Sequence, residues 1–337
     1  MAELNIVVST SMAGPSPFGV GVGEKCLARI RSVSPNIKVT DASAFLYEEQ
    51  RNDFSHKSEF DAILKDTEVI SGFRLPKDAL KRAPKLKWAS LMIAGVERFL
   101  DADMIKSDVV ITNASGLAAV PIAEWLMMVM LMFAKQMPRY FKNKEETRWE
   151  RYPSGVMAGK TVGIIGLGAI GSETARRAQA FGMKVIGCRR SQRRARYCDE
   201  MVSRENLPAL LKQSDYVIIA LPWTPETAGM IGAKELAAMK PTACILNIGR
   251  GDIIQEQELI KALEAKQIAG AGLDVFVQEP LPPSSPLWKM PKVIMTPHIA
   301  GSMEEYVTQA CEMFAKNLER YVSGKNLFNV VDKKRGY

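Results

Sequence analysis

The segment VGIIGLGAIG, Val162–Gly171, carries the strongest signal for the fold. Its apolar, β-branched start is typical of a buried strand, and Gly166, Gly168 and Gly171 then form the pattern G-x-G-x-x-G. An alanine-rich helical segment (169–181) and a second apolar run (184–188) follow, which is the context that this pattern requires. The first glycine permits a tight turn, the second lets the backbone approach a pyrophosphate, and the third lets helix and strand pack closely. The stretch predicts a dinucleotide-binding turn, and a glycine-rich turn without a ligand is the simpler alternative.

Arginines stand where a dinucleotide fold often carries an acid. Arg189 lies eighteen positions after Gly171, at the end of the second expected strand, and Arg190 follows it. An acid there accepts a hydrogen bond from the ribose 2′-OH of NAD, whereas an arginine attracts a 2′-phosphate. NADP(H) is therefore favoured, with NAD(H) as a second coenzyme. Arg193, Arg194 and Arg196 also fit a solvated basic surface, and the cluster lacks the interleaved aromatics of a nucleic-acid site.

Strand and helix patterns alternate on both sides of the glycine turn, which predicts βαβ units and parallel sheets. A dense apolar helical pattern over 120–144 separates two such α/β blocks and predicts a helix buried against another domain or subunit. The expected strands cover residues 4–9, 37–42, 68–73, 86–92, 109–115, 161–166, 184–188, 216–221, 243–249, 270–275 and 293–301. The expected helices cover residues 24–33, 75–84, 120–144, 169–181, 207–211, 234–240, 257–266 and 303–322.

Composition excludes several classes of protein. The chain has 337 residues, 47% hydrophobic and 24% charged, with a net charge of +8, which suits a soluble globular protein of two domains. Its most apolar run, 125–134, is about half the length of a membrane span, and the N-terminus lacks the features of a signal peptide. Five cysteines without a CxxC, and two histidines, make a metal site and a disulfide framework poor expectations. Reduced thiols and a cytoplasmic location fit best.

Five motifs in one order resemble the D-isomer-specific 2-hydroxyacid dehydrogenase family. The resemblance extends over about residues 95–321 and is looser before them. The motifs are GKTVGIIGLGAIG (159–171), LPWTPETAGMIG (221–232), NIGRGDIIQEQELIKAL (247–263), GAGLDVFVQEPLP (270–282) and TPHIAGSMEE (296–305). This resemblance implies two Rossmann/flavodoxin-like parallel-sheet domains. A substrate domain (1–113 and 304–337) would contain an inserted NAD(P)-binding domain (114–303). The 120–144 helix then lies between domains or subunits of a homodimer.

The resemblance also implies a catalytic set, and physical chemistry supports each member. His298 would give a proton to the developing alkoxide of a 2-keto acid near neutral pH. Glu279 would hold the other ring nitrogen and favour the imidazolium. Arg250 presents a planar fork that matches a carboxylate. Each also has an ordinary structural reading: a lone histidine, a turn glutamate, an arginine that braces a loop.

Further contacts are implied by the same resemblance. Backbone N–H groups around Ala94 and Gly95 would complete the carboxylate site. Asp274 would meet the coenzyme carboxamide, or would be a buried strand-end acid satisfied by backbone. Trp223 departs from the smaller apolar residue common in the family, and Phe73, Met92 and Trp288 are weak candidates for the substrate mouth. The full set of implied coenzyme contacts is Gly166, Leu167, Gly168, Ala169, Ile170, Gly171, Arg189, Arg190, Leu221, Pro222, Ile248, Gly249, Arg250, Asp274, His298 and Gly301.

These residues predict an NADP(H)-dependent reductase of small 2-keto acids such as glyoxylate or hydroxypyruvate, without a metal and without nucleic-acid or membrane partners. Sibling dehydrogenases of phosphite or 3-phosphoglycerate are alternatives. Two rivals of other classes are a dinucleotide-sensing co-regulator that keeps the catalytic set and a nucleic-acid protein that uses the basic 189–196 cluster, which should show a steep salt dependence.

Overall fold

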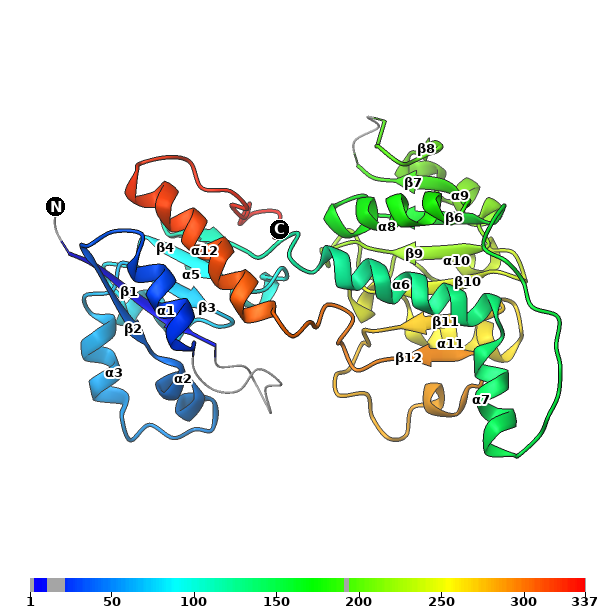
Figure 1. The fold of residues 1–337 in the computed structure, drawn as a ribbon, viewed down its shortest axis with the longest axis horizontal. Helices are drawn as coiled ribbons and strands as arrows, with labels where there is room; N and C mark the ends of the chain where they lie inside the picture. The colour runs from blue at the N-terminus through cyan, green and yellow to red at the C-terminus, as the bar shows by residue number, and fades with distance from the viewer. Residues whose placement is uncertain (1–2, 11–21, 191–193, 337) are drawn as a thin grey trace. The chain divides into compact units, whose positions relative to one another are not determined.

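The computed structural model describes residues 3–10, 22–190 and 194–336. The chain divides into two compact units: Met1–Leu117 with Met303–Tyr337, and Ala118–Ser302 (Figure 1). Arg193 lies outside the described residues. In the described residues each unit has one sheet, and the named strands pair in parallel, as the alternation of strands and helices predicts.

The first unit is a five-stranded sheet in the order β2-β1-β3-β4-β5, the order of flavodoxin-like folds. Its strands are β1 (Leu4–Ser9), β2 (Ile37–Asp41), β3 (Val69–Gly72), β4 (Trp88–Leu91) and β5 (Val110–Thr112). Its helices are α1 (Glu24–Arg31), α2 (Ser43–Gln50), α3 (Lys57–Leu64), α4 (Ala79–Arg82), η1 (Glu97–Phe99), α5 (Ala102–Lys106) and α12 (Tyr306–Val322).

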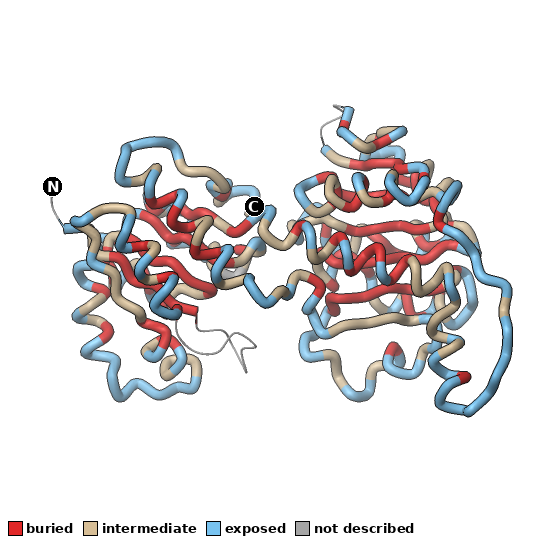
Figure 2. Tube along the Cα trace, viewed as in Figure 1, coloured by how far each residue is buried: buried red, intermediate tan, exposed pale blue. Residues whose placement is uncertain are grey.

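Alternate strand residues supply two separate cores in this unit. Val7, Ile70 and Ala89 pack with α2 and α3 on one face, and neighbouring strand residues pack with α1 and α12 on the other. Both faces are covered, which is what an all-parallel sheet requires. Figure 2 shows the buried residues concentrated along these strands.

The second unit is a seven-stranded sheet in the order β12-β11-β10-β9-β6-β7-β8. The chain enters at β6, runs outward to β8, and then returns to β9 on the other side of β6, so the strand order reverses beside the glycine turn. Its strands are β6 (Thr161–Ile165), β7 (Lys184–Cys188), β8 (Glu200–Val202), β9 (Tyr216–Ile219), β10 (Cys244–Asn247), β11 (Gly270–Leu273) and β12 (Val293–Met295). Its helices are α6 (Ala119–Ala134), α7 (Met137–Glu145), α8 (Ala169–Ala180), η2 (Arg204–Asn206), α9 (Leu207–Gln213), α10 (Ala233–Ala237), η3 (Gly251–Ile253), α11 (Glu256–Glu264) and η4 (Pro286–Lys289).

This sheet also lies between two helical layers. Val162, Ile164 and neighbouring residues pack against α6 and α8, whereas Ile165, Ile186 and their neighbours pack against α9, α10 and α11. The carboxyl end of β6, where the strand order reverses, is the place at which doubly wound sheets bind ligands.

The single helix expected over 120–144 is wrong. Two helices, α6 and α7, replace it and meet at an angle of 68°. Gln136 between them has the left-handed backbone conformation (φ 56°), and Pro138 lies in the first turn of α7. A proline has no N–H to donate to the preceding helical turn, but it fits well in the first turn of a new helix. The helix therefore ends before Pro138 and a new one begins there. Among the described residues, no single helix is long and apolar enough to cross a membrane, although this bent pair reaches that threshold when α6 and α7 are counted together.

The expectation of reduced thiols is also wrong for one pair. Cys26 on α1 and Cys311 on α12 form a disulfide within the first unit, 285 positions apart in the sequence. The fold packs these two helices side by side on one face of the sheet, which sequence spacing could not reveal. Cys188, Cys198 and Cys244 are free and buried.

Candidate active site

The glycine turn joins β6 to α8, as predicted. Gly166 has a φ of 105°, and a Cβ there would lie 2.3 Å from the Ala220 carbonyl oxygen. A Cβ on Gly171 would lie 2.0 Å from the Gly166 oxygen, so this glycine is required for packing. In contrast, among the residues that the structure describes, a Cβ on Gly168 would meet nothing within 4 Å, and no side chain caps the N-terminus of α8. The turn therefore has an open cradle beside a helix N-terminus, and a pyrophosphate fits both features.

The other turn residues divide by burial. Leu167 is buried in the core beside α8, and Ile170 packs against it. Ala169 begins the helix and is exposed. Gly301, further along the same unit, approaches α6 so closely that a Cβ would lie 3.1 Å from the Ala118 Cβ.

Arg189 and Arg190 follow β7 and differ in their surroundings. Arg189 is half-buried. Burial raises the pKa of the nearby Cys198 thiol, and the positive charge of Arg189 opposes that rise. Arg190 is exposed, and its Nη2 donates to Oε2 of Glu226 at 2.9 Å. Arg204 donates from Nη1 to the same oxygen at 3.2 Å. Arg190 therefore shares the Glu226 carboxylate with the guanidinium of Arg204.

The loop after β9 carries Leu221 and Pro222. Leu221 is half-buried beside the Gly166 turn, and its carbonyl oxygen would lie 2.5 Å from a Cβ on Gly249. Thr227 is buried and braces the loop, because its Oγ1 donates to the Pro222 oxygen at 2.9 Å and accepts from the Thr224 N–H at 2.8 Å.

Asn247 holds the segment that presents Arg250. Its Oδ1 accepts from the Gly249 N–H at 3.0 Å and its Nδ2 donates to the Arg250 carbonyl at 2.9 Å. Ile248 is buried between them. The half-buried Arg250 donates from Nη1 to the Gly249 oxygen at 2.7 Å. Its positive charge helps to lower the pKa of Glu279. Sequence reasoning did not single out Asn247, although it opens the NIGRG motif.

Asp274 fixes the chain around His298. Its buried carboxylate accepts from Thr296 Oγ1 at 2.6 Å and from the N–H groups of Ile299 and Ala300 at 2.9 and 3.0 Å. Burial raises the pKa of Asp274, against these three hydrogen bonds and the charge of His298. Of the two expectations for this residue, the structure supports the buried acid satisfied largely by backbone, and the coenzyme contact stays a prediction.

Glu279 and His298 meet directly. His298 Nδ1 lies 2.8 Å from Glu279 Oε2, and the other carboxylate oxygen accepts from the Phe276 N–H at 3.0 Å. Burial opposes the charge on Glu279, but the hydrogen bonds from His298 and Phe276 and the charges of His298 and Arg250 outweigh it and lower its pKa.

The backbone conformation of His298 is held by two hydrogen bonds. His298 has a φ of 55°, and its N–H donates to the carbonyl oxygens of Asp274 at 2.8 Å and Thr296 at 3.0 Å. Half of its side chain is exposed, and Nδ1 is held by the carboxylate, which leaves Nε2 as the ring nitrogen for an external partner. Such a pair can hold and deliver one proton.

Two predicted substrate contacts belong to the other unit. Ala94 and Gly95 follow β4, and the Ala94 carbonyl accepts from Asn113 Nδ2 at 2.9 Å. Phe73 and Met92 are buried in the same unit, where Phe73 stacks on Tyr306 and the Tyr306 hydroxyl donates to the Met92 oxygen. They have the environment of ordinary core residues, whereas Trp288 in the second unit is exposed.

Comparison with known proteins places the chain. Residues 127–300 match the family described as D-isomer specific 2-hydroxyacid dehydrogenase, NAD binding domain. A glyoxylate reductase of Korarchaeum cryptofilum is 34% identical over 78% of this chain and 82% of its own length. A D-3-phosphoglycerate dehydrogenase of Methanocaldococcus jannaschii is 32% identical over 80% of this chain but only 52% of its own length.

A solved structure agrees over nearly the whole chain. The NADPH-dependent glyoxylate/hydroxypyruvate reductase of Sinorhizobium meliloti, in complex with NADP and sulfate, has a TM-score of 0.83 and 30% identity over 99% of this chain and 100% of its own. The fold, the glycine turn and these similarities confirm the family and the enzyme class expected from the motifs. The chain belongs to the D-isomer-specific 2-hydroxyacid dehydrogenase family.

Proposed function

We propose that the protein reduces small 2-keto acids of the glyoxylate and hydroxypyruvate type to D-2-hydroxy acids. The observation that carries this proposal is the 2.8 Å contact between His298 Nδ1 and Glu279 Oε2, in the same unit as a glycine turn with an open cradle. The relatives named glyoxylate reductase and the Sinorhizobium enzyme support this substrate class.

The reduced coenzyme, when bound at the 166–171 turn, supplies the hydride. His298 donates a proton from Nε2 to the substrate oxygen while Glu279 stabilises the charged ring through Nδ1. Arg250 binds the substrate carboxylate with its planar guanidinium, and Asn247 holds the segment that carries it. Asp274 keeps the 296–300 segment in place, so that the histidine needs no rearrangement before proton transfer.

NADPH is the proposed coenzyme, with NADH as a weaker one. Arg189 and Arg190 stand after β7 where an acid would bind the ribose of NAD, and guanidinium groups attract a phosphate. The Sinorhizobium structure contains NADP.

A homodimer is the proposed assembly. Large apolar side chains on α6, on α7 and in the segment after it are exposed in the second unit: Val120, Met128, Phe141 and Trp149. Trp149 is 91% exposed, which leaves a large apolar side chain open to a partner subunit. Light scattering should give about twice the chain mass of 37.3 kDa, and a Met128→Glu/Trp149→Glu variant should give the monomer mass. A wild-type monomer contradicts the dimer. A cytoplasmic location stays a prediction.

A steady-state panel tests the substrate class. Glyoxylate, hydroxypyruvate and 3-phosphohydroxypyruvate are offered with NADPH and with NADH. The proposal expects the first two acids to be preferred, with NADPH giving the higher kcat/KM. The phosphoglycerate dehydrogenase relative makes 3-phosphohydroxypyruvate the specific alternative, and a preference for it replaces our substrate. No turnover of any acid contradicts the enzymatic proposal and favours a binding protein.

A further inference from the structure

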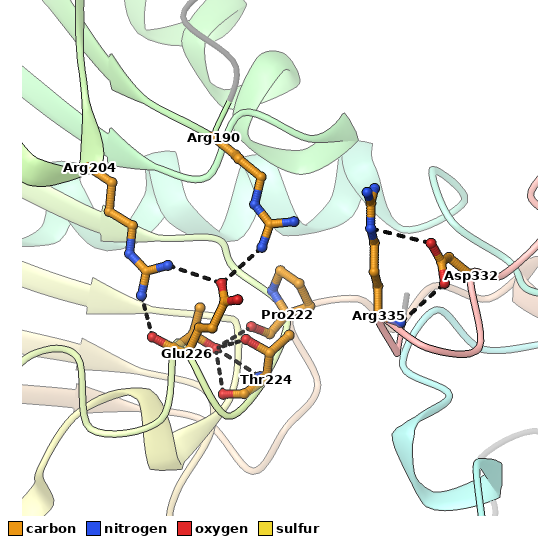
Figure 3. A network of polar contacts seen from close by, with 8 residues as sticks. Arg190, Arg204, Pro222, Thr224, Glu226, Asp332 and Arg335 are labelled. Atoms are coloured by element: carbon orange, nitrogen blue, oxygen red, sulfur yellow. Dashed lines mark hydrogen bonds and ion pairs between the residues drawn. The ribbon is translucent and has the colours of Figure 1, made fainter. Parts of the chain in front are cut away.

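Three charged side chains meet at the edge of the second sheet. Glu226 Oε2 accepts from Arg190 Nη2 at 2.9 Å and from Arg204 Nη1 at 3.2 Å, and Arg204 Nη2 also donates to the Glu226 carbonyl oxygen. Figure 3 shows the two guanidinium groups converging on this glutamate from separate segments. Neither Glu226 nor Arg204 is among the residues implied by the family motifs as coenzyme contacts.

The sheet explains this convergence. Arg190 follows β7, Arg204 follows β8, and Glu226 lies in the loop after β9. These strands run parallel in the order β9-β6-β7-β8, so their carboxyl ends share one edge. The glycine turn leaves β6 at the same edge, between the loop that carries Glu226 and the segment that carries Arg190. The three side chains therefore adjoin the expected adenosine end of a dinucleotide.

The glutamate is presented by a braced loop. Thr227, next to it in the sequence, is buried and hydrogen-bonded to Pro222 and Thr224. Arg204 holds the Glu226 backbone oxygen in addition to its carboxylate. The braced loop backbone thus places the Glu226 carboxylate near both guanidinium groups.

The two ion pairs of Glu226 are exposed enough for a competing anion to replace its carboxylate. The side chains of Arg190, Arg204 and Glu226 are 61%, 44% and 59% exposed. Exposed ion pairs contribute little to stability and break readily. A ribose 2′-phosphate carries up to two negative charges and more acceptor oxygens than a carboxylate, so it competes well for both arginines.

We propose that Glu226 is an internal anion that competes with the 2′-phosphate of NADPH for Arg190 and Arg204, and that Arg204 is a second phosphate-binding arginine. The inference rests on the proposed NADPH-dependent function. Glu226 lowers the affinity for NADPH by occupying the arginines and by repelling the phosphate. It leaves NADH binding almost unchanged, since that coenzyme has no 2′-phosphate. Glu226 and Arg204 therefore set the coenzyme selectivity in opposite directions.

Calorimetric titration of the full-length protein tests this assignment without turnover. Dissociation constants are measured for NADPH and NADH, and for adenosine 2′,5′-bisphosphate and 5′-AMP as probes of the phosphate alone. Glu226→Gln keeps the size of the side chain and removes the charge. It should tighten NADPH by about 3- to 10-fold, as expected for one charge near a phosphate at an exposed site. Arg204→Gln should weaken NADPH by a similar factor.

Matched controls come from two other exposed ion pairs of the same unit. Glu258→Gln breaks a pair with Lys261 on α11, and Arg176→Gln breaks a pair with Glu173 on α8. Both should leave the ratio of NADPH to NADH affinity within about twofold of wild type, because exposed pairs act locally. The 2′,5′-bisphosphate should follow NADPH in every variant, and 5′-AMP should follow NADH.

The outcomes separate the two proposals. A wild type that binds NADPH and NADH equally overturns the NADPH preference, whereas the competing-anion role is then decided by Glu226→Gln, which must still tighten NADPH and not NADH. A wild type that prefers NADPH, with an unchanged or lower preference in both Glu226→Gln and Glu226→Ala, overturns only the competing-anion role and leaves an ordinary surface ion pair. An Arg204→Gln variant that binds NADPH as wild type does removes Arg204 from the phosphate site.

Discussion

Replacement of Glu279 by glutamine is the sharpest test of the proton-transfer pair. Glutamine can still accept a hydrogen bond from His298 Nδ1, so the change removes the negative charge and keeps the size. Two unit charges about 4 Å apart attract by about 1 kcal/mol in water and about 4 kcal/mol at an effective dielectric constant of 20. The pair is partly exposed, with half of the His298 side chain accessible, so we expect a loss of about 1–2 kcal/mol. This corresponds to roughly a 5- to 30-fold lower kcat.

The assay is steady-state oxidation of NADPH with saturating hydroxypyruvate. Glu279→Gln should lower kcat and leave the dissociation constant for NADPH within about twofold, because coenzyme binding does not depend on the proton donor. Glu256→Gln is the control, since Glu256 accepts a long 3.4 Å bond from the Val277 N–H. A Glu279→Gln variant with wild-type kcat refutes the reasoning.

The pH dependence carries a defined sign. The folded protein lowers the pKa of Glu279 below its ordinary value of 4.5, so the contribution of its charge is complete above that value and is lost as the pH falls through the lowered pKa. The side-chain carboxyl carbon of Glu279, followed by NMR, should therefore titrate with a midpoint below the ordinary value of 4.5. A midpoint at or above that value contradicts the lowered pKa.

Three further changes test other parts of the account. Arg250→Lys replaces a planar fork by a point charge and should raise the KM for the keto acid by about 10-fold or more; a wild-type KM removes Arg250 from the carboxylate site. Gly171→Ala places a Cβ 2.0 Å from the Gly166 oxygen and should lower the melting temperature and abolish coenzyme binding in calorimetry; wild-type values contradict the close approach. Cys26→Ser/Cys311→Ser should cost about 2–4 kcal/mol of unfolding free energy, and non-reducing thiol titration of denatured wild type should find three free thiols. Five free thiols contradict the disulfide.

The parts of the fold that sequence predicted are those set by local pattern. The strand before Gly166 and the helix after it follow from apolar periodicity and glycine spacing, and the structure gives β6 and α8 within a residue of the expected bounds. The break at Gln136 had a local signal in Pro138, but the density of apolar residues outweighed it. The short helices α2, α3 and α5 carried no clear pattern and were not expected.

Contacts between distant segments were beyond sequence reasoning. Cys26 and Cys311 meet because α1 and α12 cover the same face of a sheet, and no spacing encodes that. Arg190 and Glu226 are 36 positions apart and meet because their strands end at one edge. The pairing of Glu279 with His298 was expected only through the resemblance, and the structure brings the two side chains together.

The configuration of the product tests the proposed reaction most directly. The protein is incubated with hydroxypyruvate and limiting NADPH, and the product is separated by chiral chromatography. The account predicts one D-glycerate for each NADPH oxidised, and its loss in the His298→Ala variant. Formation of L-glycerate, or no product from hydroxypyruvate or glyoxylate with either coenzyme, contradicts the account.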